Sequence, residues 1–147
     1  MSPRPDRQKY QGRNAEIGRQ EADRRLNSLP TLERRSANFS EELGFQQPML
    51  LPKGSAAVNM CTAKSDFDVA VVVQSGHVFT QKPKLWRQYQ EALSKTNADY
   101  KIEPRLVVES PFQTRGRLFK LISARSENDL FTQDMLDKLK RLLPKNE

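Results

Sequence analysis

The sequence predicts an α/β or α+β domain, with a small mixed sheet of three to four strands and helices packed on it. Residues 66–73 end in a β-branched run that is apolar on both faces, which is typical of a central, covered strand. Apolar residues at helical spacing occur before this run, in 14–29, and after it, in 84–94. With 147 residues and 36% hydrophobic side chains, the chain can build one small core.

The first 36 residues are expected to form a basic arm ahead of a domain that spans 37–147. The arm holds nine basic and five acidic side chains. Residues 1–13 contain two prolines and almost no aliphatic side chain, so we expect them to be disordered or to order only on a partner. A helix with a thin apolar stripe is expected over 14–29, and Pro30 should end it.

Several short elements are expected before the central strand. Ser40 and Gly44 are residue types that begin and end helices, which predicts a short helix between them. The apolar segment 48–52 follows, and 56–63 has room for one or two helical turns.

The C-terminal half predicts two helices and two further strands. Residues 84–94 have one apolar face and are expected to form an amphipathic helix. Segments 105–109 and 117–123 have the composition of strands, and 111–116 is expected to be the hairpin loop between them. Thr132 is expected to cap a last, leucine-rich helix.

Composition excludes several classes of protein. The longest apolar run has five residues, too few for a membrane helix, and no apolar stretch near the start predicts a secretory signal. A single cysteine and a single histidine exclude a disulfide framework and a Cys/His metal cluster. We therefore expect a reducing intracellular compartment, either cytoplasm or mitochondrion. The net charge of +7 predicts a polyanionic partner such as RNA and no membrane.

One constellation of residues carries chemistry. Gly54-Ser55 could present backbone N–H groups and a hydroxyl to a phosphate. Ten residues later, Asp66 and Asp68 flank Phe67 at the start of the central strand. Side chains at i and i+2 of a strand project to the same side, so both carboxylates could hold divalent ions. The competing interpretation is a Ser-Asp turn with solvated carboxylates at the edge of a core strand.

This Gly-Ser…Asp-x-Asp pattern resembles the signature of the DNA polymerase β-like nucleotidyltransferase superfamily, and in particular its terminal RNA uridylyl and adenylyl transferases and minimal domains. The match covers roughly 48–73, and expected topology extends it to about residue 124. The resemblance implies that Gly54 and Ser55 bind the triphosphate of an NTP substrate. It also implies that Asp66 and Asp68 hold two Mg²⁺ ions.

The chain departs from the family pattern at two points. Many members have a second glycine after Gly-Ser, and here Asn59 is the nearest substitute. The family also uses a third carboxylate on a later strand, as base for the incoming hydroxyl. The expected last strand, 117–123, offers Lys120 there. Glu109 is the only acid with a suitable setting and is the candidate third catalytic residue, with a surface role as the alternative.

Three functions are compatible with the resemblance. The first is Mg²⁺-dependent transfer of a nucleotide from NTP to an RNA end, with a protein partner supplying the wall that holds the base. The second is an inactive member of the same fold that binds RNA within a ribonucleoprotein or ribosome-type assembly. A minimal, antitoxin-like transferase acting on protein or tRNA is a third.

Two parts of the chain are candidates for contact with RNA. The arginines of the N-terminal arm could track a phosphate backbone. Arg115 and Arg117 lie between Phe112 and Phe119, and mixed basic and aromatic residues suit phosphate contact and base stacking. A solvated loop is the alternative for this second segment.

Overall fold

Three strands form one mixed sheet in the computed structural model, which describes residues 13–95, 99–125 and 128–143. The strands lie in the order β1 (Met49–Lys53), β2 (Phe67–Val73) and β3 (Ile102–Val108). β1 runs antiparallel to β2, whereas β2 and β3 are parallel. Helices pack on the sheet, which confirms the predicted mixed α+β class. Residues 1–12 of the expected basic extension lie outside the described residues.

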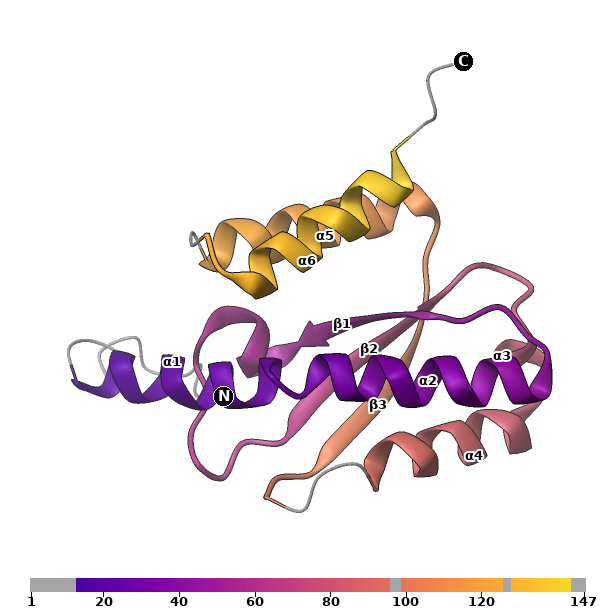
Figure 1. Cartoon of the computed structure of the whole chain (residues 1–147), viewed down its shortest axis with the longest axis horizontal. Coiled ribbons are helices and arrows are strands. Elements are labelled where there is room, and N and C mark those ends of the chain that lie inside the picture. The colour runs from indigo at the N-terminus through magenta and orange to yellow at the C-terminus, as the bar shows by residue number, and fades with distance from the viewer. Residues whose placement is uncertain (1–12, 96–98, 126–127, 144–147) are drawn as a thin grey trace, which may run out of the picture.

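Seven helical segments accompany the sheet in the described part of the chain. In Figure 1, α5 and α6 lie together on one side of the sheet, and α4 lies on the opposite side. The segments are α1 (Arg13–Leu26), α2 (Leu29–Leu43), the 3₁₀ helix η2 (Gly54–Val58), α3 (Val78–Gln81), α4 (Pro83–Ser94), α5 (Pro111–Arg125) and α6 (Leu130–Leu142).

The central strand β2 is the spine of the core, as the apolar run 66–73 predicted. Every side chain of β2 is buried except that of Asp68, which is partly exposed. Both faces of the strand are covered because helices lie on both sides of the sheet. Asp68 is the second residue of β2, so its carboxylate lies at the beginning of the strand, where the sheet meets solvent.

The N-terminal helices contribute directly to this core. Ala22 and Leu26 of α1 and Leu29 and Leu32 of α2 are all buried in the same hydrophobic cluster. Pro30 lies in the first turn of α2 and so begins a helix, where the sequence predicted that it would end one. Residue 36, the expected end of the arm, falls inside α2.

The helix α5 replaces the hairpin loop 111–116 and the strand 117–123 that the sequence predicted, and that prediction was wrong. Thr114, Leu118 and Leu121 are its buried residues, at the i, i+4, i+7 spacing of one helical face. That face packs beside α6. Since apolar residues in this segment fit both an alternating and a helical period, tertiary contacts decide between them.

The last helix is capped by Asp129 and not by Thr132, which corrects a second prediction. The Asp129 carboxylate accepts a hydrogen bond from the Thr132 N–H at 2.8 Å. Asp129 is therefore the N-cap, and Thr132 is the third residue of the helix. Arg125, at the end of α5, bonds the same Asp129 carboxylate at 2.7 Å. No helix in the described ranges has the length and apolar character needed to cross a bilayer.

Candidate functional site

The candidate site forms where β1 ends and β2 begins, because the two strands are antiparallel neighbours. Lys53, the last residue of β1, lies opposite Asp68. Gly54 therefore comes next to the Asp68 side chain, with a φ of +65°. A Cβ on Gly54 would lie 2.8 Å from Asp68 Oδ2, so both the backbone conformation and the space require glycine. The structure thus brings Gly54, the first residue of the predicted Gly-Ser pair, next to Asp68.

A second carboxylate faces Asp68 from the neighbouring parallel strand. The β2–β3 register pairs Asp68 with Glu103, so the two side chains are neighbours across the strands. Burial raises the pKa of Asp68, and the Glu103 carboxylate raises it further. The pKa of Glu103 is lowered, chiefly by its hydrogen bond with Lys101. Two like charges thus share one small volume, where a bound cation would relieve their repulsion.

Two cationic side chains border this carboxylate pair on its solvent side. Lys101 Nζ lies 3.0 Å from Glu103 Oε1, and Arg105 Nη2 lies 2.9 Å from Glu103 Oε2. Arg105 Nε is 3.8 Å from Asp68 Oδ1, too far for a hydrogen bond. Both cations are exposed. Such exposed pairs contribute little to stability, so these side chains are free to rearrange when a ligand enters.

Asp66 lies just before β2, and its charge also raises the pKa of Asp68. A buried arginine holds the turn that ends at Asp66. Arg25 of α1 is fully buried and donates hydrogen bonds to the Ser65 carbonyl from Nε at 3.1 Å and from Nη2 at 2.6 Å. Its guanidinium also lies over the ring of Tyr100, 4.7 Å from the centroid. Arg25 therefore links the two segments that carry Asp66 and Glu103.

Ser55 lies in the first turn of the short helix η2. Its hydroxyl lies 3.5 Å from the buried Cys61 Sγ. Asn59 ends η2 with a φ of +58°, in the left-handed region that glycine and asparagine tolerate best. Arg125 Nη1 donates to Asn59 Oδ1 at 3.0 Å, so α5 braces this turn from outside.

Glu109, the predicted third catalytic residue, lies at the opposite end of the parallel strand pair. Six residues separate it from Glu103, which is roughly 20 Å along a strand. Its carboxylate is bound by Arg117 Nε and Nη2, at 3.1 and 2.9 Å, and by the Thr114 hydroxyl at 3.3 Å. The structure therefore does not bring Glu109 to the aspartates and gives it a structural ion pair.

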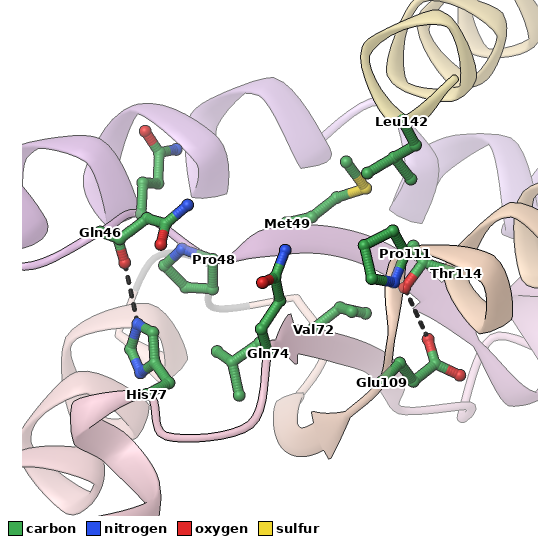
Figure 2. A pocket seen from close by; sticks show the side chains of 12 residues that line it. Gln46, Pro48, Met49, Val72, Gln74, His77, Glu109, Pro111, Thr114 and Leu142 are labelled. Carbon is green, nitrogen blue, oxygen red and sulfur yellow. Dashed lines mark hydrogen bonds between the residues drawn. The ribbon is translucent and has the colours of Figure 1, made fainter. Parts of the chain in front are cut away.

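A cavity of about 140 Å³ lies beside Glu109, between the strand ends and the tip of α6 (Figure 2). Its titratable groups already have partners. His77 Nδ1 accepts from the Phe79 N–H and its Nε2 lies 2.9 Å from the Gln46 carbonyl oxygen, which places the proton on Nε2. Figure 2 shows Glu109 turned toward Thr114. Because His77 and Glu109 already have hydrogen-bond partners, we do not include this cavity in the candidate site.

Glu103 is the residue that sequence reasoning missed. The sequence analysis expected the third carboxylate on a last strand at 117–123 and found Lys120 at that position. In the structure Lys120 is an exposed residue of α5. The signal that could have found Glu103 is its place one residue into a short apolar strand, as Asp68 is in β2. Neighbouring parallel strands that begin at the same end of a sheet bring equivalent positions side by side.

The donor set suits a divalent cation in two respects. Asp68 Oδ1 is buried and has no hydrogen-bond partner, and oxygen atoms of this kind are the ligands that Mg²⁺ prefers. The neighbouring Glu103 and Asp66 add negative charge. No group of three His, Cys, Asp or Glu side chains is already arranged around a metal position within the described ranges. Asp68 and Glu103 are therefore candidate ligands, and Asp66 precedes Asp68 by two residues.

Comparisons with protein-family models, curated proteins and solved structures found no match for this chain.

Proposed function

We propose that this protein is a nucleotidyltransferase that moves a nucleotide from an NTP to an RNA end with the help of Mg²⁺. One observation carries the proposal. The parallel register places Glu103 beside Asp68, next to the Gly54-Ser55 turn and to Asp66. The family that the sequence resembles needs a third carboxylate on a strand next to the Asp-x-Asp strand, and Glu103 supplies it where Glu109 does not.

The chain's own residues have distinct parts in the proposed reaction. The acceptor hydroxyl oxygen forms a bond to the α-phosphorus while the bond from that phosphorus to the bridging oxygen breaks, and pyrophosphate leaves. Glu103, whose pKa is lowered, is ionised at neutral pH and can take the hydroxyl proton. The backbone of Gly54 and the hydroxyl of Ser55 would hold the triphosphate.

Asp66, Asp68 and Glu103 are the residues that would hold Mg²⁺. Bound there, the ions would neutralise the phosphate oxygens and lower the pKa of the attacking hydroxyl. The assignment of RNA as acceptor rests on the net charge of +7 and on the resemblance.

The test is calorimetric titration of the whole chain with an ATP analogue whose α,β bridge is a methylene group, with Mg²⁺ or with EDTA. We expect Mg²⁺-dependent binding that Asp68→Asn and Glu103→Gln each weaken at least tenfold. Asp137→Asn, which removes an exposed carboxylate of α6, is the matched control and should bind like the wild type. Equal binding by wild type and Glu103→Gln would reject the assignment of the third carboxylate.

A second candidate is the inactive subunit of an RNA–protein assembly, and one observation favours it. Arg105 and Lys101 already neutralise Glu103, so a guanidinium could replace the metal as counter-charge. In that case the wild type would bind no nucleotide with Mg²⁺. Mg²⁺-dependent binding by the wild type would reject this second candidate.

A further inference from the structure

The outer face of α5 carries two exposed phenylalanines in one stripe. Phe112 and Phe119 keep 75% and 56% of their surface exposed, whereas most large apolar side chains of the described core are buried. At 100° per residue, positions 112, 116 and 119 fall within about 60° of one another on a helix. The two rings are seven residues apart, which is about 10.5 Å along the helix axis. Gly116 lies between them.

Gly116 has no structural reason to be glycine. A Cβ at this position would meet nothing within 4 Å, and its φ is not positive. Glycine inside a helix weakens it relative to alanine. The helix thus keeps a destabilising residue at the one point where a side chain would fill the gap between the two exposed rings. A ligand that closely approaches the helix backbone between the rings would account for it.

The charges beside this stripe have one sign. α5 contains four cationic side chains and no acidic one. Arg117 is bound by Glu109, and Arg125 by Asp23 and Asp129. Arg115 lies over the ring of Phe112, 5.6 Å from its centroid, on one flank of the stripe. Lys120 is exposed on the other flank.

We propose that this face of α5, formed by Phe112, Arg115, Gly116, Phe119 and Lys120, binds single-stranded nucleic acid. Each ring offers a platform on which a base stacks, and the flanking cations pair with phosphates. The gap over Gly116 leaves room for the strand to pass between the two stacked bases. The positive flanks select a polyanion over an apolar or cationic partner. The proposal does not depend on whether the carboxylate site transfers nucleotides.

Fluorescence anisotropy with a labelled twelve-nucleotide oligouridylate tests the stacking. Phe112→Ala with Phe119→Ala should weaken binding at least tenfold, because each stacked base contributes about that factor. Binding to a twelve-base-pair RNA duplex, whose bases are not free to stack on the rings, should not change. Leu130→Ala is the matched control, since Leu130 is an exposed apolar residue of α6 (89% exposed). A wild type that does not bind the oligouridylate, or a double variant that binds it equally, overturns the proposal.

A pair of substitutions at Gly116 separates charge from bulk without weakening the fold. Gly116→Glu and Gly116→Gln both raise helix propensity and add side chains of similar size. For a nucleic-acid strand, Gly116→Glu should bind at least about five times more weakly than Gly116→Gln, and the difference should shrink in high salt. Equal losses in the two variants would show that the face binds an uncharged surface, which overturns the proposal.

The remaining occupant is a second copy of this chain. Sedimentation velocity of the wild type and the Phe112→Ala, Phe119→Ala variant decides this. A wild-type dimer that the double variant converts to a monomer, with unchanged binding of oligouridylate, overturns the proposal. A monomer in both cases supports it.

Discussion

The two ends of the β2–β3 strand pair hold their acids in different surroundings. At one end, the carboxylate end, Asp68 and Glu103 face each other, and one Asp68 oxygen has no hydrogen-bond partner. At the other end, Glu109 is 12% exposed and is bound by Arg117 and Thr114. Figure 2 shows the Glu109 carboxylate turned toward Thr114.

This difference shows which acid is available for chemistry. Arg117 donates from Nε to Glu109 Oε1 and from Nη2 to Glu109 Oε2, so the charge of Glu109 is neutralised within the fold. Burial raises the pKa of Asp68 and the neighbouring Glu103 carboxylate raises it further, whereas an ion pair would lower it. A perturbed carboxylate pair beside a glycine turn indicates a site, whereas a satisfied carboxylate indicates packing.

The largest effect on stability is expected from Arg25, the buried residue that supports the segment leading into Asp66. Arg25→Met removes the hydrogen bonds to the Ser65 carbonyl and leaves Glu21 without its buried partner. We expect a loss of about 3 kcal/mol in the free energy of unfolding, because the buried groups are left unsatisfied. Urea unfolding followed by circular dichroism measures this loss.

The neighbouring Arg24 provides the control for Arg25. Arg24 also pairs with Glu21, at 2.9 Å, but its side chain is exposed. Arg24→Met should therefore change stability by less than about 0.5 kcal/mol. Similar losses for the two variants would contradict the assigned role of Arg25.

The next effect compares the two glutamates directly. Glu109→Gln should lower the free energy of unfolding by about 2 kcal/mol, because Arg117 loses its charged partner in a half-buried setting. Glu103→Gln should lower it by less than about 0.5 kcal/mol, because the ion pairs of Glu103 with Lys101 and Arg105 are exposed to solvent. Urea unfolding of both variants in EDTA measures the difference, and equal losses would remove the contrast between the two ends.

The smallest effect concerns the pH dependence of Asp68→Asn. Because the pKa of Asp68 is raised on folding, its stabilising contribution is present below pH 4 and lost as pH rises through the folded pKa. The variant lacks that loss. Measured in EDTA, Asp68→Asn should match the wild type near pH 3 and gain up to about 1 kcal/mol over it at pH 7. A gain that is larger at pH 3 than at pH 7 would mean that the pKa is lowered.

Much of the fold was predictable from local signals. The central strand and the amphipathic helix near 84–94 were confirmed as β2 and α4. The helix α5 was missed although its start has a local signal. Ser110 and Gln113 form a reciprocal capping pair, with the Ser110 N–H donating to Gln113 Oε1 at 2.8 Å. Pro111 then occupies the first helical position, where proline is favoured.

The sequence by itself determined the Gly54-Ser55 turn, the strand behind Asp68 and the excess of positive charge. These depend on neighbours along the chain: a glycine that tolerates positive φ, a β-branched run and a composition. Only the tertiary structure decided that Glu103, and not Glu109, faces Asp68, because strand register is a long-range property. It also decided that α5 is a helix with two rings exposed, because packing on α6 selects which apolar residues are buried.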